Sequence, residues 1–141
     1  MAILNHAGEV ADLCAFAVAS RDAGVVMPLI APVPMVTNQS SISALAVFPG
    51  LALPRSFVDA IVRAGESDDA GLIASEAFIE GVASTGHFAG INLSGPAGGP
   101  DPWRRLETTE RFIALARRVF AATRRDANSP FRDPSFRPTD P

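Results

Sequence analysis

The chain has 141 residues, 48% of them hydrophobic, and a formal net charge of −3, which together indicate about one domain with enough apolar residues for a buried core. All 12 basic residues are arginines, which excludes lysine chemistry, and the weakly acidic charge provides no field that attracts nucleic acid. The single cysteine excludes an internal disulfide and a two-cysteine metal motif.

The N-terminal segment predicts a strand, a helix and a second strand. Residues 1–5 are apolar, and residues 9–23 place apolar side chains on one helical face before Gly24, a typical helix stop. Residues 25–31 form a continuous apolar run, as expected of a strand that is buried on both faces of a parallel sheet. Pro28 weakens this strand, because proline cannot donate a hydrogen bond to the ladder.

Three helices are expected in the middle of the chain. A short helix covers about residues 40–48 and ends at a Pro-Gly pair. The next begins at Pro54, a favourable first-turn residue, and stops at Gly65. The third begins after Ser67, a typical N-cap, and ends at Gly86.

The C-terminal segment predicts one more strand and a long helix. Residues 87–94 form the strand, and the helix begins between Pro102 and Thr109 and ends at about Arg125. Residues 126–141 are rich in proline, arginine and aspartate without periodicity, so we expect a disordered tail.

The alternation of strands and helices indicates an α/β fold with parallel strands and right-handed crossovers. A three-stranded parallel sheet leaves two open edges, which favours an incomplete unit. The N-terminus has no signal-peptide pattern, and residues 25–36, the longest apolar run, contain three prolines and are too short to span a bilayer. We therefore expect a cytoplasmic protein that does not bind membranes.

Polar side chains cluster at the predicted strand ends, where parallel α/β folds hold their ligands. The clusters are Asn5 and His6 after the first strand, Thr37, Asn38 and Gln39 after the second, and Asn92 and Ser94 at the third. Such groups can orient a heteroaromatic ring or an amide. Structural roles are the alternative: Asn38 would cap the next helix, Asn92 would bond loop backbone, and His6 would be exposed near a helix start.

The sequence lacks the motifs of several kinds of binding and catalytic site. Residues 95–100 are rich in glycine and proline but match neither phosphate-binding glycine pattern, because the prolines remove N–H donors. Ser94 is not in a nucleophile-elbow sequence. His6 and His87 are far apart without a nearby ligand-type carboxylate pattern, so we expect no metal site, and no residue is assigned as a catalytic acid.

The order of these weak motifs from about Ile3 to Leu93 resembles the C-terminal part of the methylenetetrahydrofolate reductase family. The resemblance rests on Asn5, Gly24, residues 25–31, residues 32–34, Thr37-Asn38, Leu53-Pro54, residues 66–69, Gly86 and residues 87–94. It implies a partial TIM-type (βα) barrel, roughly the last three βα units, over residues 1–125.

The resemblance also implies an activity. The family reduces 5,10-methylenetetrahydrofolate to 5-methyltetrahydrofolate with NAD(P)H through FAD, in one-carbon metabolism and methionine biosynthesis. By resemblance, Asn5 would contact the folate, and Thr37, Asn38 and Asn92 would line the barrel mouth. The protein in such chemistry mainly binds and orients the cofactor.

The chain departs from the family in four respects. The family's Pro-Gly after the second strand is not kept, because the prolines here are shifted. Asn5 stands where the family has Gln, and Ser94-Gly95 stands where many members have Asn-Arg. The family's first five strands, which supply most FAD contacts and the acidic groups, have no counterpart here.

Three hypotheses follow. The chain is an inactive reductase fragment, a half-barrel completed by another chain, or a small α/β binding or interaction module without catalysis.

Overall fold

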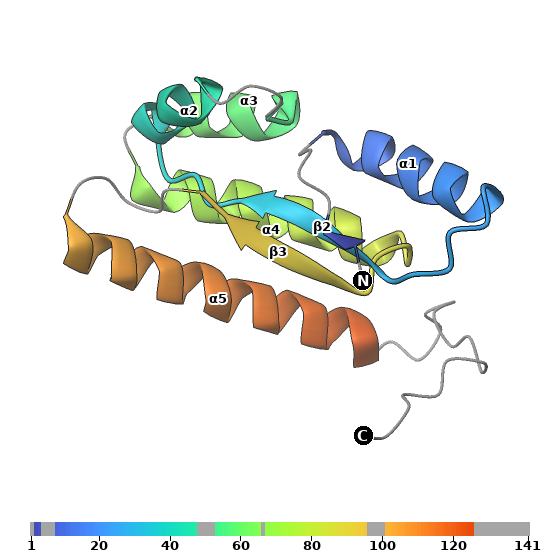
Figure 1. The fold of residues 1–141 in the computed structure, drawn as a ribbon. Coiled ribbons are helices and arrows are strands. Elements are labelled where there is room, and N and C mark those ends of the chain that lie inside the picture. The colour runs from blue at the N-terminus through green and yellow to red at the C-terminus, as the bar shows by residue number, and fades with distance from the viewer. Residues whose placement is uncertain (1, 4–7, 48–52, 66, 96–100, 126–141) are drawn as a thin grey trace.

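A computed structural model describes residues 2–3, 8–47, 53–65, 67–95 and 101–125 of the chain. Within these residues, strands and helices alternate as the sequence predicts (Figure 1). The elements are β1 Ala2–Ile3, α1 Val10–Asp22, β2 Leu29–Pro34, α2 Gln39–Ala46, α3 Arg55–Ala64, α4 Asp68–Ser84, β3 Gly90–Ser94 and α5 Pro102–Arg125. The predicted tail at residues 126–141 lies outside the described residues.

The strands form one parallel sheet with the order β1-β2-β3. β1 pairs with the start of β2, where Ala2 lies beside Leu29, and β2 pairs with β3 along its whole length. The predicted α/β class with parallel strands is confirmed. Because consecutive strands are neighbours, each helical connection crosses over a single strand spacing.

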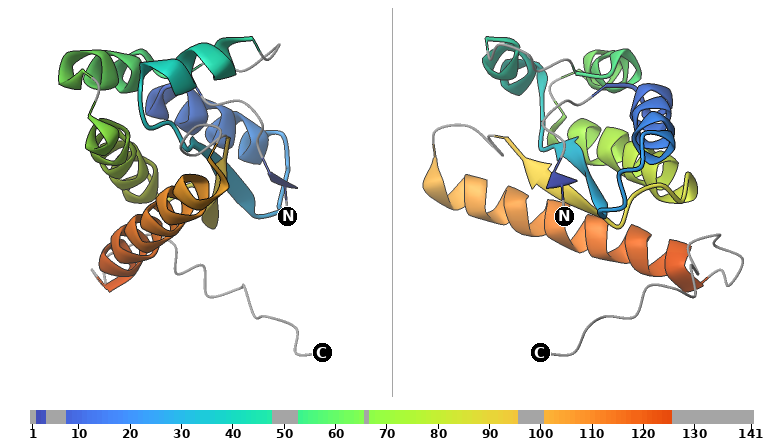
Figure 2. Two further views of the ribbon diagram at one scale, coloured as in Figure 1. Left: turned by 90° about the vertical axis from the view of Figure 1, so that its left-hand side faces the viewer. Right: turned by 45° about the vertical axis from the view of Figure 1, so that its right-hand side comes forward.

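α4 and α5 cover one face of the sheet, and α1 packs beside α4 (Figure 2). Ala31 and Val33 of β2 lie beside Ile91 and Leu93 of β3, and all four side chains join the core shared with these helices. Side chains alternate along a strand, so the residues between them point to the opposite face, away from α4 and α5.

β2 starts later than predicted, at Leu29 instead of residue 25, and includes Pro32 and Pro34. Both prolines fit because of the ladder geometry. Met35 donates its N–H to the Ser94 carbonyl oxygen at 2.8 Å, so odd-numbered residues of this segment point their N–H groups toward β3. The even-numbered residues, which include both prolines, point their backbone nitrogens toward the β1 side. The described part of β1 pairs only with Leu29 and Ile30, so the missing N–H groups of the prolines leave no ladder hydrogen bond unmade there.

The other boundaries differ modestly from those predicted. The strand predicted over residues 1–5 is described only as Ala2–Ile3. The strand predicted from residue 87 begins at Gly90, because the chain before it is still leaving the turn at Gly86, whose φ is 68°. There the His87 N–H donates to Thr85 Oγ1 at 3.2 Å, a turn hydrogen bond instead of a ladder bond.

Gly71 allows α4 to pack directly on the loop that leaves β2. A Cβ atom at this position would lie 1.8 Å from the Val36 carbonyl oxygen and 2.7 Å from the Thr37 Cα. Only glycine fits such a close approach between a helix and another backbone. This contact with α4 therefore fixes the position of the loop that carries Thr37 and Asn38.

Candidate functional site

Thr37 and Asn38 build the turn between β2 and α2. Asn38 is the N-cap of α2, and its Oδ1 accepts hydrogen bonds from the Ser41 N–H at 3.0 Å and the Ser41 hydroxyl at 3.1 Å. Thr37 is 2% exposed, and its Oγ1 lies 3.1 Å from Ser41 Oγ. The capping alternative for Asn38 is thus observed, while its amide nitrogen makes no hydrogen bond with the described residues. Gln39, the first residue of α2, is exposed.

Asn92 lies on the sheet face that points away from α4 and α5. It is the neighbour of Pro32 in the register, and it alternates with Ile91 and Leu93, which face the helices. Its side chain is half-buried and makes no hydrogen bond with the described residues. Its amide is therefore available to a ligand, as are the exposed side chains of Gln39 and Ser94.

The ends of β2 and β3 meet at one edge of the sheet. The hydrogen bond from the Met35 N–H to the Ser94 carbonyl oxygen joins them at 2.8 Å, and Ser94 is exposed at this edge. The structure thus brings the Thr37 turn and the end of β3 to the same edge, as the sequence predicts for parallel strands. Asn5 and His6 lie outside the described residues.

Glu9, the N-cap residue of α1, is a polar residue whose contacts no local sequence pattern predicts. Its Oε1 accepts from the Arg55 N–H at 2.6 Å and the Ser56 N–H at 3.4 Å, and its Oε2 accepts from the Ser56 hydroxyl at 3.0 Å. A carboxylate of α1's N-cap residue thus occupies the N-terminus of α3, whose own N-cap, Pro54, has no capping side chain. Position 54 holds proline instead of Ser, Thr, Asp or Asn. This is the one signal in the sequence that the capping group of α3 comes from another segment.

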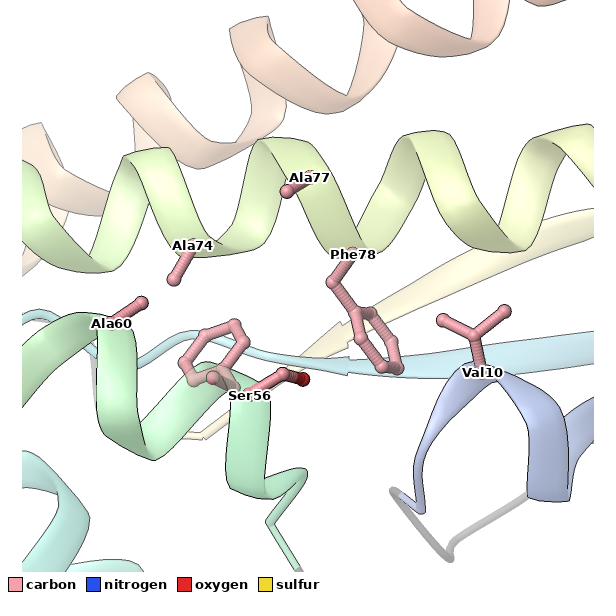
Figure 3. A pocket seen from close by; sticks show the side chains of 7 residues that line it. Val10, Ser56, Ala60, Ala74, Ala77 and Phe78 are labelled. Carbon is pink, nitrogen blue, oxygen red and sulfur yellow. The ribbon is translucent and has the colours of Figure 1, made fainter.

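A small cavity lies between the helices and not at the strand ends (Figure 3). Its volume is about 160 Å³. Phe57 and Phe78 form one wall as an edge-to-face pair with ring centres 6.4 Å apart. The full lining is Val10, Ser56, Phe57, Ala60, Ala74, Ala77 and Phe78. Its lining is apolar apart from Ser56, and it offers no group for acid–base chemistry.

The opposite end of the sheet carries His87. Arg21 of α1 donates from Nη1 to His87 Nδ1 at 3.1 Å, because a guanidinium has no acceptor. This bond ties the end of α1 to the segment before β3, at the edge opposite the polar strand ends. His87 therefore lies at the end of the sheet opposite the candidate site.

The described polar groups at the strand ends carry no charge. The groups at the strand ends are the side chains of Thr37, Asn38, Asn92 and Ser94, all neutral, and none can neutralise a pyrophosphate as an arginine would. The helix cavity is smaller than the roughly 300–1,000 Å³ of typical ligand pockets. Among the described residues, neither feature indicates a flavin site.

Within the same residues, no cluster of three or more His, Cys, Asp or Glu side chains is placed to bind a metal ion. No helix in the described ranges has the length and apolar character needed to cross a membrane. Comparisons of the chain with protein-family models, curated proteins and solved structures found no match.

Proposed function

We propose that this chain is the C-terminal part of a (βα) barrel of the methylenetetrahydrofolate reductase type, which binds folate weakly and is inactive alone. The observation that carries the proposal is the meeting of polar side chains at the carboxyl edge of β2 and β3. Asn92 is the residue we expect to contact the folate first, and the Asn38 amide nitrogen the second. Asn5 keeps its role by resemblance.

The arrangement of the sheet supports this proposal. Consecutive parallel strands lie in chain order, and α4 and α5 cover one face. In a closed barrel the helices lie outside and the opposite faces of the strands point to the centre. Asn92 and Pro32 occupy that opposite face, so Asn92 would point to the barrel interior near its mouth.

The chemistry of the site supports binding without catalysis. Amide and hydroxyl groups can hydrogen-bond the ring edge of a pterin, but they do not transfer protons near neutral pH. In the parent reaction FAD would carry the hydride from NAD(P)H, and the missing barrel units would have to supply its site.

Two measurements test the proposal. The purified chain is expected to be colourless and to leave NADH unoxidised, while titration calorimetry with 5-methyltetrahydrofolate detects binding. Asn92→Ala is expected to weaken that binding about fivefold, which corresponds to about 1 kcal/mol for one lost hydrogen bond. Ser43→Ala, an exposed substitution on α2, serves as the matched control and should leave the affinity unchanged.

Two results would contradict the proposal. If the folded chain binds no folate, the proposed substrate is wrong. If the purified protein is yellow and oxidises NADH, the proposed inactivity is wrong. A non-catalytic interaction module is the second candidate. The outer edge of β3, which pairs with no other strand among the described residues, favours it, since such an edge is available to another polypeptide.

A further inference from the structure

The free edge of β3 lies on one side of the molecule, away from β2. β3 is the last strand in the sheet order, so the outer N–H and C=O groups of Gly90–Ser94 have no strand partner among the described residues. α5 lies beside α4 (Figure 1). Its Arg111 and Arg118 bond Asp69 and Glu76 of α4 respectively. These two arginines mark the flank of α5 that points back toward α4.

The opposite flank of α5 carries exposed apolar side chains. Ile113 comes two residues after Arg111, which places it about 200° around the helix and so away from α4. Leu106, seven residues earlier, shares this side. Leu106 is 52% exposed and Ile113 is 36% exposed. This apolar flank therefore extends beyond the free edge of β3, where neither α4 nor β2 covers it.

We propose that this side is the interface of a homodimer, in which β3 pairs with β3 and α5 with α5 across one two-fold axis. Such an isologous contact makes both pairs antiparallel. α5 spans Pro102–Arg125, so full overlap of two antiparallel copies places the axis between Ile113 and Ala114. The exposed Ile113 side chains of the two copies then pack against each other at the axis.

The charges on this flank are complementary in the same arrangement. With the axis between residues 113 and 114, Glu110 of each copy faces Arg117 of the other copy. Both side chains are exposed, and neither takes part in an ion pair among the described residues. The spacing of Glu110, Ile113 and Arg117 by three and four residues keeps them on one helix face. Two intermolecular ion pairs therefore flank the apolar contact.

One axis can serve the strands and the helices together. Phe112, beside the midpoint of α5, is fully buried and packs with Met35 and Leu93. The midpoint of β3 is Asn92, the neighbour of Leu93. The centres of the strand and of the helix thus lie at nearly the same level. Pairing of the β3 edges would also satisfy backbone groups that are otherwise left to water.

Charge reversal tests the dimer. Sedimentation velocity of the full chain at micromolar concentration is expected to show a dimer. Glu110→Arg and Arg117→Glu should each raise the dissociation constant at least tenfold, because each change places like charges opposite each other at both ends. An equimolar mixture of the two variants should restore the dimer, because opposite charges then face each other at both positions. Circular dichroism checks that each variant is folded.

A second variant tests the apolar contact. Ile113→Glu should give a monomer, whereas Val47→Glu, at a 77% exposed position at the end of α2, should leave the dimer intact. A monomeric wild type, a dimer insensitive to both charge reversals, or a mixture that stays monomeric would overturn the inference. The proposed function is judged separately: a dimer without folate binding refutes only that proposal, and a folate-binding monomer refutes only the dimer.

Discussion

Gly71→Ala should destabilise the protein although it replaces glycine by alanine inside a helix. In an unobstructed helix this change stabilises by about 1 kcal/mol. Here the added methyl group would lie 1.8 Å from the Val36 carbonyl oxygen, whereas ordinary contacts begin at 3.4 Å, so α4 or the loop must move by about 1.6 Å. The obstacle is backbone, which cannot rotate away as a side chain can.

The magnitude follows from two opposing effects. Overpacking of a tight interior costs about 1–3 kcal/mol and occasionally more. With three backbone atoms of the loop within 2.7 Å of the new carbon, we expect the upper end of that range, which exceeds the gain in helix propensity. The net result should be a loss of about 2 kcal/mol in the free energy of unfolding.

Gly81→Ala is the matched control in the same helix. Its Cβ would lie 3.1 Å from Val10 Cγ2, a side-chain atom that can yield, so its stability should be unchanged or raised by up to about 1 kcal/mol. Urea unfolding followed by circular dichroism compares the two midpoints at equal m-values. If Gly71→Ala is as stable as Gly81→Ala, α4 does not pack on the Val36 carbonyl and the account of this loop is wrong.

Other single changes test the polar contacts. Glu9→Ala should lower the free energy of unfolding by about 1–2 kcal/mol, because the N–H groups at the start of α3 lose their acceptor. Glu9→Gln keeps one acceptor oxygen and should lower it less. Equal losses in the two variants would contradict a capping role. Ser75→Ala should raise stability by about 1 kcal/mol in urea unfolding, because this fully buried hydroxyl has no hydrogen-bond partner among the described residues; a loss would show that it has one. Asn38→Ala should cost about 1 kcal/mol by the same measurement, and Asn38→Asp should restore most of it, since the carboxylate keeps the cap.

The sequence by itself determined the alternation of strands and helices and the parallel sheet. These features depend on local signals: apolar periodicity, glycine stops such as Gly65 and Gly86, and N-caps such as Ser67. The meeting of the β2 and β3 ends at one edge also followed, because parallel strands share their direction. The capping alternative for Asn38 could be read from its place before a helix.

Only the tertiary structure decided the contacts between segments distant in sequence. The bounds of β2 depended on which neighbouring strand each backbone N–H faces. No local rule predicts that direction for Pro32 and Pro34. Glu9 caps a helix that begins 46 residues later, and Gly71 touches a loop 35 residues earlier, so neither role has a local pattern. The availability of Asn92 likewise depends on the face that α4 and α5 leave uncovered, because burial is a property of packing and not of the residue.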